Sequence, residues 1–271
     1  MTTSTQWQLA QDAAERYQTV LTPYILGPFA KALVDFARLQ AGEQVLDVGC
    51  GTGAAARYAA AAVSSSGRVF GTDVNNDMLN VARALPPVQG ANVEWRKADA
   101  TQLPFEDNQF DAVCAAQVVQ FIPQKAAALA EMRRVVTPHG RVAVSLWCPI
   151  EESPYFDTLV RVIATHIGVE TAAGLKSAFN LCQIDEIADL LETAGFATVE
   201  IESIQLDLPL PPLAEFVPLH IHATPMTVGF SKATQPIQQA IIHEVAEQLC
   251  NYVQANQTSI PFRSHLIIGR K

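Results

Sequence analysis

The sequence predicts an α/β protein whose mostly parallel sheet carries helices on both faces. The first observation is the apolar run 45–48, typical of a short buried parallel strand, with three glycines at alternate positions directly after it. The second is the alanine-rich segment Ala54–Val63, which has the composition of the helix that such a strand feeds. The third is the regular alternation of strand and helix patterns through the middle of the chain. Together these observations predict a doubly wound fold.

Two amphipathic helices are expected before this strand. Apolar residues recur at helical spacing over 5–21, after the possible caps Ser4 and Thr5, and a second helix is expected over 28–40 with Pro28 in its first turn. Tyr17 and Tyr24 on these helices either pack in the core or face a substrate.

The glycine turn has the composition of a ligand-binding loop. Positive φ angles and close backbone approach exclude a Cβ, which explains Gly49, Gly51 and Gly53. The N–H groups at the start of the following helix are free to bind polar ligand atoms. We therefore expect a small ligand at the carboxyl end of this strand, with Asp47 and Cys50 beside it.

Two kinds of ligand compete for this turn. Residues 51–56 also fit the G-x-G-x-x-A pattern of dinucleotide folds. Asp47, however, places a negative charge where a pyrophosphate would lie. A sulfonium amino acid with a free ammonium group suits that charge better.

The later elements follow the same alternation. Asn76 is a possible cap for a helix carrying Met78, helices are expected over 123–136 and from Ile184 to a stop at Gly195, and a strand over 198–201. After these the pattern changes. The sequence predicts a proline-rich connector over 208–213, a helix over 237–253 and a last strand over 263–269.

The run 45–53 resembles the first motif of the class I S-adenosylmethionine-dependent methyltransferases, in particular the small-molecule group with the ubiquinone/menaquinone C-methyltransferases. The likeness continues, in order, over 71–74, 93–105, 110–117 and 138–145, where His139 departs from the usual Pro-Gly-Gly turn. The resemblance implies a seven-stranded sheet of order 3-2-1-4-5-7-6 with the last strand antiparallel. It also implies a cap insertion over the acceptor site.

The resemblance implies S-adenosylmethionine as cofactor and S-adenosylhomocysteine as product. Asp73 would accept hydrogen bonds from the ribose hydroxyls, although its spacing also fits a dinucleotide site. Asp99 would accept from the adenine amino group, with Met78 and Ala100 covering the ring. The expected cofactor-binding residues are Asp47, Gly49, Cys50, Gly51, Gly53, Asp73, Val74, Met78, Asp99, Ala100 and Gln117.

Four residues are candidates for acting on the acceptor. Gln117 and Gln120 follow the fourth strand, where they either orient the acceptor or the methionine moiety or cap the next helix. His220 and His222, in the expected cap, are the favoured histidine bases, and they share a face only if that segment is extended. No metal site is expected.

Composition and net charge limit the classes of molecule that the protein is expected to bind. The 271 residues are 49% hydrophobic and 17% charged, with a net charge of −9, which opposes a phosphate backbone and favours a small neutral or apolar acceptor over nucleic acid. Five widely spaced cysteines indicate neither a disulfide framework nor a zinc site, so a reducing cytoplasmic location is expected. We expect no membrane insertion, no secretion signal, and a monomer or homodimer.

The chain is expected to form a single methyltransferase domain. Its predicted parts are N-terminal helices (1–40), a cofactor-binding core (41–148), a core continuation (149–202), a cap insertion (203–260) and the last strand (261–271). The predicted activity is methyl transfer by in-line displacement. The alternatives are a catalytically silent S-adenosylmethionine- or S-adenosylhomocysteine-binding protein and a nicotinamide-dependent reductase.

Overall fold

The computed structural model describes residues 13–255 and 257–271. Within them the strands are β1 (Gln44–Val48), β2 (Arg68–Asp73), β3 (Val93–Lys97), β4 (Phe110–Ala116), β5 (Val136–Trp147), β6 (Thr198–Leu210), β7 (Val253–Gln254) and β8 (Gln257–Arg270). The helices are α1 (Ala13–Arg16), the π-helical η2 (Tyr17–Leu26), α2 (Gly27–Ala37), α3 (Ala54–Val63), α4 (Asn76–Ala84), α5 (Lys125–Val135), α6 (Pro154–His166), α7 (Val169–Lys176), α8 (Ile184–Thr193), α9 (Leu213–His222), α10 (Thr227–Phe230) and α11 (Gln235–Gln248). Short 3₁₀ turns are η3 (Val119–Phe121), η4 (Ile150–Glu152), η5 (Ser177–Phe179) and η6 (Cys250–Tyr252).

The strands form one sheet of order β3-β2-β1-β4-β5-β8-β6, and the two-residue β7 pairs with β8. Strands β1 to β5 are parallel to one another, whereas β8 runs antiparallel to both β5 and β6. The predicted order 3-2-1-4-5-7-6 is therefore confirmed, because β8 is the seventh long strand. The carboxyl ends of β1, β2 and β4 consequently meet at one edge of the sheet.

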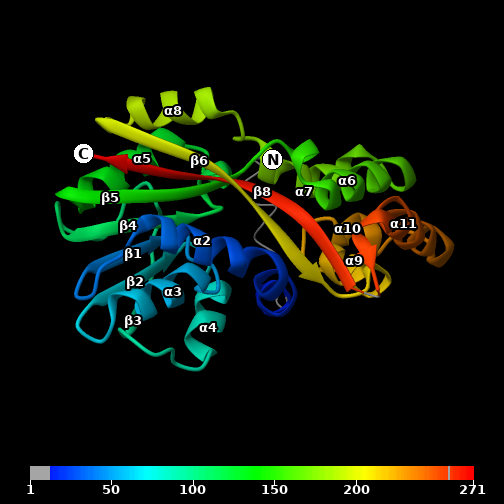
Figure 1. Ribbon diagram of the computed structural model, residues 1–271, viewed down its shortest axis with the longest axis horizontal. Coiled ribbons are helices and arrows are strands. Elements are labelled where there is room, and N and C mark those ends of the chain that lie inside the picture. Colours follow the sequence, from blue (N-terminus) through cyan, green and yellow to red (C-terminus); the bar gives the residue numbers. More distant parts are fainter. Residues whose placement is uncertain (1–12, 256) are drawn as a thin grey trace.

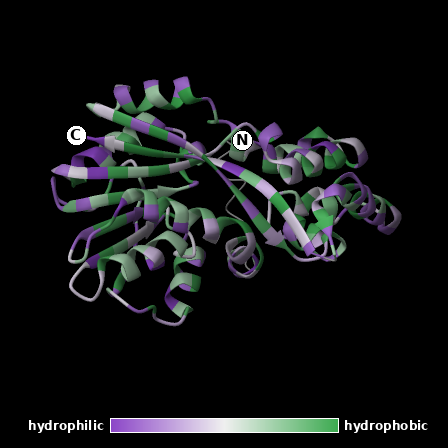
Figure 2. Cartoon of the chain, in the orientation of Figure 1, coloured by the Kyte–Doolittle hydropathy of each residue, from purple (hydrophilic) through white to green (hydrophobic). Residues whose placement is uncertain are grey.

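Helices cover both faces of the parallel strands (Figure 1). Helices α2 and α3 pack on one face around Leu33, Ala56 and Val69, and α5 and α8 pack on the other around Leu129 and Ile187. In Figure 2 hydrophobic residues dominate the inner strands, whereas hydrophilic and hydrophobic residues alternate along β6 and β8. The inner strands are thus buried on both faces, as the mainly apolar run 45–48 predicts.

Strands β6 and β8 are much longer than the sequence predicts. They pair from Thr198↔Arg270 to Leu210↔Thr258, so the expected strands 198–201 and 263–269 are too short and the expected connector 208–213 is wrong over its first half. Strand β6 lies at the sheet edge, where Pro209 costs no ladder hydrogen bond to a further neighbour. The two strands continue past the parallel sheet and carry a second group of helices (Figure 1).

This second group, the cap lobe, consists of α6, α7, α9, α10 and α11 around the far ends of β6 and β8 (Figure 1). Its core includes Tyr155, Phe216, Ile241 and Phe262, all fully buried. Helices α6 and α7 come from the segment 149–202, so residues on both sides of the expected insertion 203–260 build this lobe. Helix α11 ends at Gln248, before the end predicted at residue 253.

The amino-terminal helices form one continuous helical segment rather than the two that the sequence predicts. The predicted caps Ser4 and Thr5 and the start of the helix 5–21 lie outside the described residues. Gly27 donates its N–H to the carbonyl of Thr22, and a Cβ at Gly27 would lie 2.5 Å from that oxygen, so the π-helical turn requires glycine.

The segment Ala13–Ala37 is long and apolar enough to cross a membrane by length and composition alone. Half of its most apolar window is buried inside the protein, and Ile25, Phe29 and Leu33 pack in the two cores that flank it. This burial is typical of a core helix.

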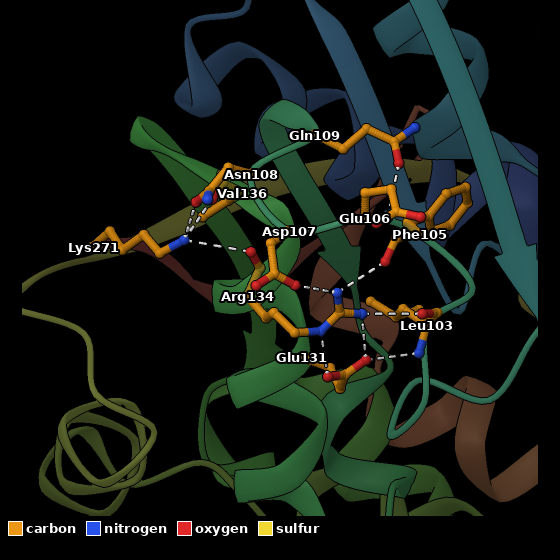
Figure 3. A network of polar contacts seen from close by, with 10 residues as sticks. All are labelled: Leu103, Phe105, Glu106, Asp107, Asn108, Gln109, Glu131, Arg134, Val136 and Lys271. Atoms are coloured by element: carbon orange, nitrogen blue, oxygen red, sulfur yellow. Dashed lines mark hydrogen bonds and ion pairs between the residues drawn. The ribbon is translucent and has the colours of Figure 1, made fainter.

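An arginine holds the loop between β3 and β4 against α5 (Figure 3). Arg134 donates to the carboxylates of Glu131 and Asp107 and to the carbonyls of Leu103 and Phe105. Glu131 also accepts from the N–H of Leu103 at 2.9 Å. These contacts fix the loop that contains Asp99 and Ala100.

Two predicted helix boundaries have clear local causes. The capping residue of α4 is Asn75 rather than Asn76, since its side chain accepts from the N–H of Asp77 at 2.8 Å. The predicted stop at Gly195 is confirmed: its φ of +90° favours glycine, and α8 ends two residues earlier.

Candidate functional site

An open cleft, the edge cleft, lies at the carboxyl ends of the parallel strands and holds about 1140 Å³ of empty space. Asp73 borders it from the end of β2, Asp99 and Ala100 from the loop after β3, and Gln117 from the end of β4. Met78 lines it from α4. Groups from three successive strands therefore face one elongated space.

The glycine turn forms the floor of this site. Gly49, Gly51 and Gly53 have φ angles of +65°, +53° and +89°, as the sequence predicts. A Cβ at Gly49 would lie 2.3 Å from the side chain of Val118, and one at Gly53 would lie 2.3 Å from Trp95. Glycine is thus required here both for the backbone turn and for packing.

A smaller space, the glycine pocket, adjoins the cleft and is lined by Asp47, Cys50 and Thr52. Asp47 is buried, and its Oδ2 accepts from the N–H of Ala56 at 2.8 Å. Among the described residues, Asp47 Oδ1 and Thr52 Oγ1 are buried without a hydrogen-bond partner. Such atoms indicate a missing polar partner.

The electrostatics of Asp47 depend on what fills this pocket. Burial raises the pKa of its carboxyl to about 8, with a smaller rise from nearby Asp73 and an opposing effect from the hydrogen bond of Ala56. A ligand cation beside Oδ1 would reverse this shift, because it favours the carboxylate.

The two further acids are held differently. Asp73 accepts from the N–H groups of Gly51 and Asn75, both at 2.8 Å, and burial nevertheless raises its pKa. Asp99 is exposed and accepts from the N–H and hydroxyl of Thr101, which lower its pKa. Both side chains retain lone pairs for ligand hydroxyl or amino groups.

The charges favour a cationic ligand over a phosphate. The described side chains that line the edge cleft and the glycine pocket include three aspartates and no lysine, arginine or histidine. A pyrophosphate would find no cationic side chain among these lining residues, whereas a sulfonium and an ammonium group would find carboxyl groups as counter-ions. The site therefore fits S-adenosylmethionine.

Comparison with known proteins decides the family. A methyltransferase domain model matches residues 46–144. The ubiquinone/menaquinone biosynthesis C-methyltransferase UbiE of Cupriavidus taiwanensis is 34% identical over 175 residues, which are 60% of this chain and 71% of that protein. The chain belongs to the class I S-adenosylmethionine-dependent methyltransferases. S-adenosylmethionine is accordingly its cofactor.

Solved structures share the fold of this methyltransferase. Phosphoethanolamine N-methyltransferase 2 of Haemonchus contortus, in complex with phosphomonomethylethanolamine and S-adenosylhomocysteine, has a TM-score of 0.59 and 20% identity over 97% of this chain and 58% of that one. An arsenic(III) S-adenosylmethionine methyltransferase from Chlamydomonas reinhardtii has a TM-score of 0.52 and 19% identity over 92% and 74%. At these identities the likeness concerns the fold alone.

A third space, the apolar chamber, lies between the methyltransferase sheet and the cap lobe and holds about 510 Å³ of empty space. Its described lining carries no lysine, arginine, aspartate or glutamate, and the residues are Tyr17, Leu21, Ile25, Leu26, Gln117, Gln120, Phe121, Trp147, Phe156, Leu175, Ala178, His220 and Thr224. Tyr17 and Gln117 also line the edge cleft and the glycine pocket, so all three spaces meet at these two side chains.

The expected cofactor-binding residues of the methyltransferase gather at this site with one exception. Asp47, Gly49, Cys50 and Gln117 line the glycine pocket, and the edge cleft takes in Gly49, Gly51, Asp73, Val74, Met78, Asp99, Ala100 and Gln117. Gly53 lines neither space, since it packs against Trp95.

The four residues predicted to act on the acceptor do not all lie at the apolar chamber. Gln117, Gln120 and His220 line the apolar chamber, and His222 does not. Both histidines lie on helix α9 rather than on an extended segment, so they point in different directions. His222 instead contacts the hydroxyl of Thr227 at 3.0 Å.

His220 is held neutral. Its Nδ1 lies 2.9 Å from the hydroxyl of the fully buried Tyr155, its ring stacks on Phe216 with centroids 5.7 Å apart, and burial lowers its pKa to about 3. An imidazole with so low a pKa is a weak proton acceptor at neutral pH.

Sequence reasoning missed most of the chamber walls. Trp147, Phe156 and Leu175 come from segments far apart in the chain, and their types are those of ordinary core residues. Of the two tyrosines left open, Tyr17 lines all three spaces and Tyr24 packs against Phe216, with ring centroids 5.5 Å apart. Nothing in the local sequence separates these two roles.

The five cysteines of the methyltransferase are free, and three of them are buried. A search of the described part of the chain finds no cluster of three or more potential metal ligands among histidine, cysteine, aspartate and glutamate.

Proposed function

We propose that this protein transfers a methyl group from S-adenosylmethionine to a small uncharged acceptor held in the apolar chamber. The observation that carries this proposal is the meeting of the edge cleft, the glycine pocket and the chamber at Tyr17 and Gln117. A donor bound along the strand ends would thus present its methyl group toward a space with apolar walls.

The donor would be held by the three aspartates. The unpartnered Oδ1 of Asp47 suits the ammonium group, and Asp73 suits the ribose hydroxyls. Asp99 suits the adenine amino group, with Met78 and Ala100 on the ring. Gly49 and Gly51 would let the donor approach the backbone closely, and Cys50 lines the glycine pocket beside them.

When bound, S-adenosylmethionine supplies a methyl group activated by its sulfonium, which a nucleophilic acceptor atom takes by in-line displacement. The protein has then mainly to align the acceptor and exclude water. Tyr17 and Leu26 of the amino-terminal helix cover the junction, and Phe121 and Trp147 form apolar walls. A phosphorylated acceptor, such as the one in the Haemonchus complex, would find no cationic partner in this chamber.

Proton transfer to His220 is not part of this proposal. Because its imidazole stays neutral at physiological pH, we assign it to shaping and polarising the chamber together with Tyr155. His222 lies outside the chamber and has no proposed role in the reaction.

We further propose a small-molecule acceptor and a cytoplasmic location. The acidic net charge of −9 supports a small-molecule acceptor rather than nucleic acid, and the five free cysteines support a reducing, cytoplasmic location. We propose a single methyltransferase domain, active as a monomer or homodimer, in which the cap lobe selects the acceptor.

Calorimetric titration with S-adenosylmethionine and S-adenosylhomocysteine tests the donor site. We expect both to bind the native protein, and Asp73→Ala to weaken both by about tenfold or more with an unchanged circular dichroism spectrum. Absence of binding to the native protein would refute the proposal.

Incubation with donor labelled in the methyl group and a small-molecule extract tests the transfer. A labelled product that the native protein forms and Asp73→Ala forms more slowly supports an enzyme. Donor binding without any labelled product would favour the silent binding protein instead.

A further inference from the structure

Three polar side chains connect strand β8 to the apolar chamber. Gln117 Nε2 lies 2.9 Å from Ser264 Oγ, and Gln120 Nε2 lies 3.3 Å from Gln117 Oε1. Ser264 is fully buried and Gln120 is 5% exposed. Residues more than 140 positions apart in the sequence thus form one hydrogen-bonded row.

The direction of this row is fixed at its buried end. Ser264 Oγ lies 2.9 Å from the carbonyl oxygen of Leu146 and 3.2 Å from that of His265, and carbonyl oxygens only accept, so the serine hydrogen is directed to these carbonyls. Ser264 then accepts from Gln117, which places the amide nitrogen of Gln117 toward Ser264 and its oxygen toward Gln120. Gln120 must donate to that oxygen, and its own oxygen is left without a partner in the row.

Gln120 Oε1 is buried, and no hydrogen-bond partner for it exists among residues 13–255 and 257–271. Native proteins rarely leave a buried acceptor unpaired. Because Gln120 lines the chamber while Gln117, its partner, also lines the edge cleft, the unpaired oxygen belongs to the region where cleft and chamber meet.

We propose that Gln120 is a specificity-determining residue, whose Oε1 accepts the hydrogen of an uncharged hydroxyl group on an apolar acceptor molecule. This inference rests on the proposed function. The row Ser264–Gln117–Gln120 engages the amide N–H₂ of Gln120 and leaves its oxygen as the unpaired group of this chamber-lining side chain. A molecule that has the same apolar body but no hydrogen to donate leaves Gln120 unpaired and binds more weakly. An ammonium group is disfavoured because no carboxylate lines the chamber.

The test compares two probes with the same ring system, 1-naphthol and 1-methoxynaphthalene, in which a methyl group replaces the hydroxyl hydrogen. Each is titrated into the full-length protein saturated with S-adenosylhomocysteine. We expect the native protein to bind 1-naphthol at least about tenfold more tightly. Gln120→Met, which keeps the side-chain length without the acceptor, should reduce the preference to less than about threefold, mainly by weakening 1-naphthol.

Two further variants examine the row and the specificity of the effect. Ser264→Ala frees the amide of Gln117 to turn and should lower the preference to an intermediate value, even though this residue does not line the chamber. Gln205→Leu removes an exposed glutamine whose amide donates to Asp207 on β6, and should keep the full preference. Gln120→Asn, which retracts the oxygen, replaces Gln120→Met if that variant does not fold.

Equal binding of the two probes by the native protein, binding of neither, or an unchanged preference in the Gln120 variant would overturn the inference. Titration of S-adenosylhomocysteine in the same preparation separates it from the proposed function. If S-adenosylhomocysteine binds and the preference is absent, only the role of Gln120 fails. If S-adenosylhomocysteine does not bind, the proposed function itself fails.

Discussion

At the scale of single residues, two glycines with the same backbone angle separate strain from packing. Gly42 has a φ of +90° and Gly53 a φ of +89°. A Cβ at Gly42 would meet only Ser66 Oγ at 3.8 Å, whereas one at Gly53 would overlap Trp95 at 2.3 Å. We expect Gly42→Ala to destabilise the protein by about 1 kcal/mol and Gly53→Ala by roughly 1–3 kcal/mol more, measured by urea unfolding.

A double-mutant cycle with Trp95 tests whether packing causes the larger cost of Gly53→Ala. In a Trp95→Leu background the indole is gone, so Gly53→Ala should cost about as much as Gly42→Ala. An equal cost for Gly53→Ala with and without the indole would show that packing against Trp95 is not the reason for this glycine.

The raised pKa of Asp47 predicts a pH dependence of stability. In the folded protein this carboxyl remains protonated up to about pH 8, whereas in the unfolded chain it ionises near pH 4. Between these values the folded state binds the extra proton, so the contribution of Asp47 to stability falls as pH rises and levels off above pH 8.

Asp47→Asn does not titrate and isolates this effect. The unfolding free energy of the native protein minus that of Asp47→Asn should decrease by roughly 1 kcal/mol per pH unit between pH 6 and pH 8. Urea unfolding at several pH values measures it. A difference that stays constant over this interval would contradict the raised pKa.

The aspartates proposed to hold the donor are predictable from sequence because Asp47, Asp73 and Asp99 lie at or just after strand ends that local spacing identifies. Asp47 and Asp73 follow from the glycine turn and the next strand, and the structure brings them to one cleft edge. The acceptor side is not predictable in this way. Trp147 and Phe156 have the types of core residues, and only tertiary packing decides that they face a chamber.

At the scale of elements, the contacts of Arg134 predict that one side chain stabilises the loop between β3 and β4. Its guanidinium donates to two carboxylates and two carbonyls, and it is 30% exposed (Figure 3). Arg134→Met keeps the alkyl part and removes all of these bonds. We expect a loss of about 1–2 kcal/mol in urea unfolding and weaker S-adenosylhomocysteine binding, because the same loop contains Asp99.

Lys31 provides the control for this prediction. It pairs with Asp35 at 2.6 Å, but both side chains are more than half exposed. Lys31→Met should therefore leave the unfolding midpoint within error of the native value. A loss as large as that of Arg134→Met would mean that simple charge removal accounts for both.

Long-range pairing explains why some elements escaped prediction. Helix α3 was predicted to the residue, since its alanine-rich composition and the preceding glycine turn are local signals. The predicted strand 198–201 is shorter than β6, because Pro209 and its neighbours are typical of a connector. Its pairing with β8 and its edge position let the strand continue, and neither is visible in the local sequence.

At the scale of the whole molecule, β6 and β8 make the two lobes interdependent. Each of these strands spans roughly 40 Å at ordinary strand geometry and takes part in both the parallel sheet and the cap lobe. The continuous helical segment from Ala13 to Ala37 likewise contributes Leu33 to the sheet core and Leu21 and Ile25 to the cap core. Separating the lobes would expose both sets of contacts, so we expect one cooperative unfolding transition.

Single-tryptophan variants report on each lobe separately. Trp95 lies on β3 of the sheet, Trp147 borders the chamber at the end of β5, and Trp7 is replaced by phenylalanine in both variants. Within each variant we expect the urea midpoint from fluorescence to coincide with that from far-ultraviolet circular dichroism, and saturating S-adenosylhomocysteine to raise both together. If Trp147 instead reports a transition at lower urea than Trp95, with no shift on adding S-adenosylhomocysteine, the cap lobe unfolds on its own and is a separate domain.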